Sequence, residues 1–401
     1  MDFYFRDSIS REVLNNYLSR AVTHTSLLDT HEGKSDTFAD DLRMLKNTGA
    51  KFIGRAAYVW GETNDEEHFR ICRERAAVCH ETDPEFVLQC CVFECVCKNF
   101  CENIVIPNWV YEAFNQPIPE ENQKRRFSLE KMSFPDGRFN NHWGKDTGVP
   151  NILTLEGQMW LYYRACMYIN CGCEAIHFGQ VWLIGALDKD KNWETWRKLV
   201  MKVREYAKIH ARRGYVICDA HCHGIITADN HSVFDFNSFP IRLKETENES
   251  CKYKCIAEEN YSDSIFGKSK GGIHPSGYIS DPLPFLVEFD NFGVSKTPGE
   301  FTPDLDNIYA WGYDEITWFS LQPKEYRAEF LRYISDWVNS RYPEGWVQMP
   351  SRRMTTYSWD RANGKRQRGM YRANNNSPDC PEGYGDEEII KEIFSAHELR
   401  A

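Results

Sequence analysis

The sequence lacks several patterns that identify common protein classes. No stretch approaches 18 consecutive apolar residues, so no membrane-spanning helix is expected. The first residues, MDFYFRDSISREVL, are charged and hold no apolar segment of a secretory signal. No Gly-x-Gly-x-x-Gly or Walker loop follows the first predicted strand, which disfavours nucleotide binding, and no Gly-x-Ser-x-Gly elbow of a serine hydrolase is present.

An excess of basic residues is also missing. The 48 Lys and Arg face 59 Asp and Glu, for a net charge of -11, and this balance argues against a nucleic-acid partner. The 15 cysteines are an odd number, they include no paired Cys-x-x-Cys, and several, such as Cys90 and Cys218, lie in apolar runs. Buried free thiols of this kind predict a reducing compartment, so we expect a cytoplasmic protein.

What the sequence does contain is a repeated unit in which a helix ends at a glycine and an apolar strand follows. Gly49 precedes AKFIGRAAYVWGE, Gly172 precedes EAIHFGQVWLIG, and Gly214 precedes YVICDAHCHG. A glycine that terminates a helix before a buried strand is typical of βα repeats. Polar residues at the ends of such strands favour a barrel with its chemistry at one rim.

We therefore predict an α/β fold, a (β/α)8 TIM barrel, with long insertions after strands three and five. The catalytic barrel is expected over residues 1–359, and residues 360–401 are expected to form an irregular extension with a short helix. The predicted strands are Tyr17–His24, Lys51–Trp60, Phe86–Val96, Ala175–Ile184, Tyr215–Cys222, Pro284–Gly293, a seventh that starts near Ile308, and Gly345–Pro350. An open doubly wound sheet is the alternative.

Acidic residues gather where these strands should end, and aromatic residues accompany them. The acids are Glu62, Glu94, Asp219, Glu288, Asp290, Asp314 and Glu315. Cleavage of a glycosidic bond uses a pair of carboxyl groups, one to protonate the leaving oxygen and one to attack the sugar or activate water. Aromatic faces such as Trp60, Trp311 and Trp318 can pack on the sugar ring.

Two segments concentrate these features, EFDNFG and GYDEITWF. Glu288 and Asp290 would share one face of a regular strand, whereas Asp314 and Glu315 could not both point inward. The structural alternative is that one acid of each pair caps a helix or accepts backbone N–H groups at a loop.

The segments AKFIGRAAYVWGE, EAIHFGQV, CDAH, LVEFDNFG and WGYDEITWF together resemble the superfamily of TIM-barrel glycoside hydrolases, over roughly residues 10 to 355. The resemblance implies a glycosidase that acts on a carbohydrate. Retaining enzymes of this superfamily carry an acid/base Glu at the end of strand four and a nucleophilic Glu at the end of strand seven. Glu315 matches the latter, but strand four offers Gln180, so Asp219 or Asp290 would have to supply the acid.

From this resemblance we expect Glu315 and Asp290 to be the catalytic carboxyl pair, with Asp219 as a substitute. The side chains expected to bind substrate are Arg55, Glu62, Glu94, His177, Gln180, His221, Glu288, Asp314 and Trp318. Arg55 has an equally good structural role in a salt bridge inside the barrel, because a buried guanidinium needs a carboxylate. No cofactor, metal, nucleic acid or membrane partner is expected.

Two other hypotheses stay open. Asp219, His221 and His223 alternate as D-x-H-x-H, a spacing that could bind Zn in a metal-dependent hydrolase if all three faced one way. In known barrels with this pattern the motif lies on the first strand, whereas here it falls on the predicted fifth. The chain could also be a sugar-binding barrel that lost one acid and with it catalysis.

Overall fold

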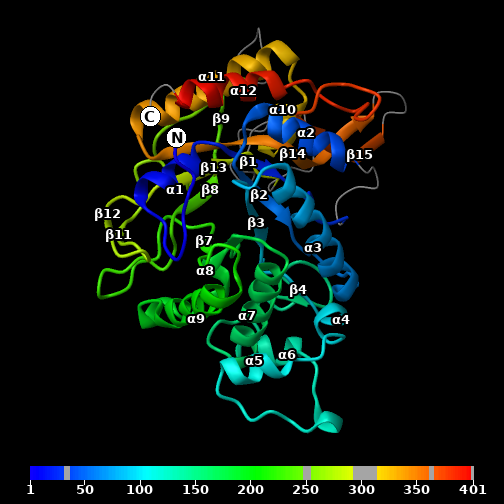
Figure 1. The fold of residues 1–401 in the computed structure, drawn as a ribbon, viewed down its shortest axis with the longest axis vertical. Helices are drawn as coiled ribbons and strands as arrows, with labels where there is room; N and C mark the ends of the chain where they lie inside the picture. The colour runs from blue at the N-terminus through cyan, green and yellow to red at the C-terminus, as the bar shows by residue number, and fades with distance from the viewer. Residues whose placement is uncertain (31–36, 247–253, 292–313, 361–364, 399–401) are drawn as a thin grey trace.

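The computed structural model describes residues 1–30, 37–246, 254–291, 314–360 and 365–398. Its centre is a nearly closed barrel of parallel strands, and their order around the barrel follows the chain (Figure 1). The barrel strands are β1 (Ala21–His24), β2 (Phe52–Ala57), β3 (Val87–Cys91), β6 (Ala175–His177), β7 (Ile217–Asp219), β8 (Asn237–Pro240), β13 (Phe285–Glu288) and β14 (Gly345–Asp360). A parallel bridge between His221 and Ser238 brings β8 back to β7. The predicted TIM-barrel fold is confirmed.

Helices surround the barrel, with α2, α11 and α12 on one side of the strands and α7 and α9 on the opposite side (Figure 1). The longer helices are α1 (Arg11–Leu18), α2 (Phe38–Thr48), α3 (Asp65–Thr82), α7 (Leu155–Asn170), α9 (Glu194–His210), α11 (Lys324–Arg341) and α12 (Glu387–Glu398). Shorter helices are α4 (Lys98–Cys101), α5 (Asn108–Ala113), α6 (Leu129–Met132), α8 (Val181–Ile184), α10 (Glu315–Ser320), η1 (Glu121–Gln123) and η2 (Lys189–Lys191). No helix in the described part of the chain combines the length and apolar character needed to cross a bilayer.

The three predicted helix–glycine–strand units are present. Gly49 follows α2 with φ of 73°, Gly172 follows α7 with φ of 98°, and Gly214 lies beyond α9 with φ of 63°. A residue with a side chain is strained in this left-handed region, so glycine lets each helix stop and the chain reverse into the next strand.

The prediction for the sixth and seventh strands is wrong. The sixth barrel strand is β8, which the sequence reading missed, and the segment predicted as strand six is the seventh strand, β13. The predicted seventh strand begins at 308–313, outside the described residues, and its continuation is helix α10, with Asp314 as the N-cap residue. Asp314 accepts a hydrogen bond from the backbone N–H of Thr317, which is the structural alternative raised for this acid.

The lengths of the loops also differ from the prediction. The insertion after β3 is present and holds α4, α5 and α6, with the small strand pair β4 (Val96–Cys97) and β5 (Thr147–Gly148). The segment 224–281, predicted as one insertion after strand five, instead contains β8, so the second long insertion follows the sixth strand. That insertion carries two small strand pairs, β9 (Lys244–Glu245) with β10 (Cys255–Ile256) and β11 (Gly272–Ile273) with β12 (Ile279–Ser280).

The barrel interior has an apolar lower layer and a polar upper layer. The lower layer is one core cluster that includes Ala21, Phe52, Val87, Ala175, Ile217, Phe236 and Leu286. Helix α1 packs against this cluster through Leu14, Tyr17 and Leu18. Strand side chains alternate, so the residue two positions later on each strand faces the same interior nearer its carboxyl end.

The C-terminal segment packs against the barrel strands and helices. Strand β15 (Lys365–Arg372) pairs antiparallel with β14, and α12 packs beside α2 through an ion pair between Arg43 and Glu387 at 2.9 Å. Helix α12 is the short terminal helix that the sequence predicts, whereas strand β15 was not expected.

Candidate active site

The polar upper layer of the barrel forms the candidate active site. It consists of Thr23, Gln89, His177, Asp219, Ser238, Glu288 and Gln348, each two positions after an interior residue or its register equivalent on β1, β3, β6, β7, β8, β13 and β14. All of them are buried, with at most 5% of each residue exposed. Buried polar side chains are normally hydrogen-bonded, or they have a function. The partners of these side chains therefore indicate what the layer does.

Glu288, the last residue of the seventh barrel strand, forms an ion pair with Arg55 from β2. The Arg55 Nε donates to Glu288 Oε2 at 2.7 Å, and its Nη2 makes a very short contact with Oε1. The Nε2 of His221 lies 2.9 Å from the same Oε1 and 3.1 Å from Arg55 Nη2. Burial alone would raise the pKa of Glu288, but the charge and hydrogen bonds of Arg55 outweigh it and hold that pKa well below its usual range.

Arg55 reaches Glu288 from an unusual backbone conformation. Its φ is 57°, and the register of β2 against β3 is irregular between Ile53 and Ala57. Its backbone N–H donates to the side-chain Oε1 of Gln89, on the neighbouring strand β3, at 3.1 Å. Left-handed conformations of residues other than glycine cost about 1–3 kcal/mol and concentrate at functional sites. The internal salt bridge, one of the two roles predicted for Arg55, is present.

Asp219 holds His177 beside this ion pair. The Asp219 carboxylate lies 2.8 Å from His177 Nδ1 and accepts hydrogen bonds from Gln89 Nε2 at 2.6 Å and Ser238 Oγ at 2.8 Å. The rings of His177 and His221 meet edge to face with centroids 4.8 Å apart. Burial lowers the pKa of His177 despite the opposing charge of Asp219.

Asp290 lies just beyond β13 and faces a different arginine. Arg353 Nη2 from β14 donates to Asp290 Oδ1 at 2.7 Å and to Asn291 Oδ1 at 3.2 Å. Burial would raise the pKa of Asp290, but the Arg353 charge lowers it. Asp290 and Glu288 are therefore both held as carboxylates.

Glu315 and Trp318 are buried next to these acids and make structural contacts. The Glu315 carboxylate accepts the backbone N–H groups of Arg242 at 2.6 Å and Asp290 at 3.0 Å. Trp318 is 2% exposed and packs against Phe330, with ring centroids 4.8 Å apart. Glu315 thus connects the loop after β8 to the loop after β13 through hydrogen bonds. Through its bond to the Asp290 N–H it can position Asp290.

The remaining predicted residues lie on loops above β2, β3 and β6. Glu94 accepts hydrogen bonds from the backbone N–H of Gln180 at 2.9 Å and from its Nε2 at 3.1 Å, so these two predicted residues pair with each other. Glu62 instead accepts from Asn99 Nδ2 at 3.0 Å. Gln180 is the N-cap residue of α8 and no longer belongs to the strand.

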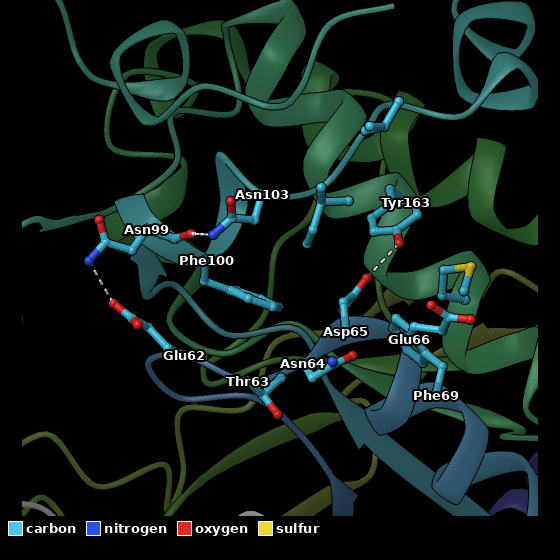
Figure 2. A pocket seen from close by; sticks show the side chains of 13 residues that line it. Glu62, Thr63, Asn64, Asp65, Glu66, Phe69, Asn99, Phe100, Asn103 and Tyr163 are labelled. Atoms are coloured by element: carbon cyan, nitrogen blue, oxygen red, sulfur yellow. Dashed lines mark hydrogen bonds between the residues drawn. The ribbon is translucent and has the colours of Figure 1, made fainter.

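Glu62 lines a pocket outside the polar layer of the barrel. The pocket has a volume of about 610 Å³ and lies between the N-terminus of α3 and helices α4 and α7. Figure 2 shows Asp65 in this pocket, where it accepts a hydrogen bond from the Tyr163 hydroxyl. Phe100 and Asn103 lie across the pocket from Tyr163. Its lining does not include Arg55 or Glu288.

Asp219, His221 and His223 do not converge as a metal-binding trio. Strand β7 ends at Asp219, so the predicted alternation stops there. Asp219 faces His177, His221 faces Glu288, and the His223 Nε2 lies 2.8 Å from the carbonyl oxygen of Asp263. Within the described residues, no three His, Cys, Asp or Glu side chains are grouped to hold a metal.

Sequence reasoning missed Thr23, Gln89, Ser238, Gln348 and Arg353 as site residues. Arg353 lies three residues after the predicted eighth strand, and its position could have marked it. Ser238 was missed with its strand, because apolar and polar residues alternate only over Phe234–Asn237 and this pattern stops before Ser238. Gln89 is the one polar residue in the apolar run FVLQCC, which was a usable signal.

Comparisons with known proteins give distant structural likenesses. No protein family and no curated protein matches the sequence. The structure is similar to a debranching enzyme from Nostoc punctiforme (9% identity, TM-score 0.47, 100% of this chain and 82% of that one). It is also similar to the GH113 β-mannanase AaManA from Alicyclobacillus acidocaldarius in complex with ManMIm (12%, 0.42, 94% and 97%) and to AmyP in complex with maltose (11%, 0.47, 98% and 81%). These values are too low to transfer a reaction, so function has to be argued from the site itself.

Proposed function

We propose that this protein is a glycoside hydrolase and that Glu288 is its nucleophilic carboxylate. The observation that carries the proposal is an ionised, buried glutamate at the carboxyl end of the seventh barrel strand, held by Arg55 and His221. The sequence resemblance puts the nucleophile of retaining barrels at this strand end. In the structure the seventh barrel strand ends at Glu288, which supports Glu288 and not Glu315 as the candidate for that role.

The site can lower the barrier to glycosidic cleavage in two ways. Glu288 is anionic and fixed, so it can attack the anomeric carbon without first losing a proton. Asp290, the second carboxylate, can stabilise the positive charge that develops on the sugar in the transition state. In this proposal Glu315 positions Asp290 through the backbone and does not itself react, and Asp219 supports His177.

Aromatic side chains next to the carboxylates offer a surface for a sugar ring. Phe93 lies under the Arg55 guanidinium, 5.4 Å from its carbon to the ring centroid. Trp60 contacts both Phe93 and Trp143, with ring centroids 5.5 Å and 5.1 Å away. Trp60 is 37% exposed, which leaves part of its surface open to a substrate. We therefore propose a carbohydrate substrate bound between this surface and Glu288.

Glu288→Gln is the direct test. Hydrolysis of nitrophenyl glycosides and of maltose- and mannose-based oligosaccharides would be measured for the wild type and the variant. We expect the variant to lose at least about 10³-fold in kcat, because the amide cannot act as a nucleophile.

Glu174→Gln is the matched control for this test. Glu174 is also fully buried and paired with arginine, Arg212, but it lies at the opposite, amino end of β6. This variant should lower stability and keep turnover. A wild-type protein that binds oligosaccharides without releasing product would reject hydrolysis and support the non-catalytic sugar-binding barrel.

A further inference from the structure

Cleavage of a glycosidic bond requires a proton for the leaving oxygen, and the two carboxylates of the site are unsuited to provide it. A general acid needs a pKa near or above the working pH. The pKa values of Glu288 and Asp290 are both lowered, because Arg55 and Arg353 outweigh the effect of burial. Another group must supply the proton if the proposed function holds.

His177 lies where such a group is needed. It is the last residue of β6, the fourth barrel strand, and it is 3% exposed. Its ring contacts the ring of His221, whose Nε2 is 2.9 Å from Glu288. Phe93, part of the proposed sugar surface, contacts the same His177 ring at 6.0 Å between centroids. The imidazole therefore contacts both the aromatic surface and the histidine that is paired with Glu288.

Asp219 fixes which nitrogen of His177 is available. Its carboxylate can only accept hydrogen bonds, so the 2.8 Å contact requires the proton on His177 Nδ1. The Nε2 is buried and has no hydrogen-bond partner among the described residues. A buried polar atom without a partner costs about 1–3 kcal/mol, a cost that a ligand hydroxyl or ether oxygen would relieve.

We propose that His177, oriented by Asp219, is the general acid and base of this site. In the first step Glu288 bonds to the anomeric carbon, the C–O bond to the leaving group breaks, and the leaving oxygen takes the Nε2 proton of the imidazolium. In the second step neutral His177 takes a proton from water, and the water oxygen displaces Glu288 from the sugar. One water is consumed, and both His177 and Glu288 return to their starting states.

The pH dependence follows from the two groups and their surroundings. Activity requires protonated His177 and ionised Glu288. Burial keeps the His177 pKa below its usual 6.5, and Asp219 opposes the shift while His221 and Arg55 add to it. The midpoint of the basic limb of kcat/KM should therefore lie below pH 6.5. The pH optimum should be acidic.

The test compares leaving groups on His177→Asn. Phenyl and 2,4-dinitrophenyl glycosides are prepared for the sugar that the wild-type protein hydrolyses. Phenolate is a poor leaving group and needs a proton, whereas dinitrophenolate leaves without one. We expect kcat/KM to fall by about 10³-fold for the phenyl glycoside and by less than about tenfold for the dinitrophenyl glycoside, with the basic limb abolished.

Two further variants separate this role from a structural one. His24→Asn removes another buried histidine at a strand end, one that faces Ser351 and Asp41 instead of the cluster, and it should not change the ratio between the two substrates. Asp219→Asn should shift the basic limb to lower pH. Equal losses on both glycosides with an unchanged basic limb would overturn the role of His177 and leave the proposed hydrolase intact. A wild-type protein that cleaves no glycoside would overturn both.

Discussion

Arg55 contacts several parts of the site at once. Its guanidinium pairs with Glu288 and contacts His221 and Phe93, while its backbone N–H binds Gln89. The left-handed backbone of Arg55 and the bulge in β2 make these contacts possible together. The ion pair and the unusual conformation are thus two aspects of one local arrangement.

Arg55→Gln should change the pH profile before anything else. Without the Arg55 cation, burial is opposed only by the weaker effects of His221 and Arg353, so the pKa of Glu288 rises and the acidic limb of kcat/KM should move to higher pH. Removing one partner of a buried pair should also cost about 3–5 kcal/mol of unfolding free energy. The measurements are activity from pH 3 to 8 and urea unfolding.

Arg164→Gln is the control for this variant. Arg164 is a buried arginine that pairs with Asp65 on α3, away from the site. It should lower stability without moving the acidic limb. An acidic limb at the same pH in both variants would mean that Arg55 does not set the pKa of Glu288.

Helices α2 and α12 show how the C-terminal segment is held to the barrel. Glu387, the first residue of α12, accepts two hydrogen bonds from Arg43, one from Asn47 Nδ2 and one from the backbone N–H of Asn375. The Glu387 side chain is 1% exposed, whereas that of Arg43 is 47% exposed and also pairs with Asp40 at 2.6 Å.

Glu387→Gln should lower the free energy of unfolding by about 1 kcal/mol, because the buried carboxylate loses its charge while Arg43 keeps Asp40 and solvent as partners. Glu388→Gln is the matched control, since Glu388 accepts a hydrogen bond from Asn47 at an exposed position and should change stability by less than about 0.5 kcal/mol. Equal stability of both variants in urea unfolding would show that α12 is not held through Glu387.

Prediction of the elements depended on how long and how regular each one is. Helices α7, α9 and α11 are long, and the barrel strand that follows each of them was predicted. Strand β8 covers only Asn237–Pro240, contains a proline and has two polar residues, so its sequence does not distinguish it from a loop. Missing it shifted the count by one and moved the strand-seven role to Glu315.

Acid should destabilise the whole molecule through buried histidines. His274 stacks on Tyr278 at 4.2 Å between centroids, and burial, only partly opposed by Asp235, lowers its pKa to about 4 from 6.5. The native state binds this proton less readily than the unfolded chain, so the stability present above pH 6.5 is lost as pH falls towards 4. This loss amounts to about 3 kcal/mol.

The corresponding experiment is urea unfolding of wild type and His274→Gln at pH 7 and pH 4. The variant should lose about 3 kcal/mol less than the wild type between these two pH values. His210→Gln, at an exposed position on α9, should keep the wild-type difference. Identical pH dependence in wild type and His274→Gln would show that His274 does not titrate on unfolding.

The sequence by itself determined the fold class, most barrel strands, the three glycine-ended helices and the set of polar residues at strand ends, because these depend on periodicity and on backbone preferences within short segments. Only the tertiary structure decided which polar residues pair. Glu288 with Arg55, and Asp219 with His177, come from strands distant in the chain, and closing the barrel brings their alternating side chains into one layer. The placement of an acid in that layer, not its presence in an apolar run, separates Glu288 from Glu315.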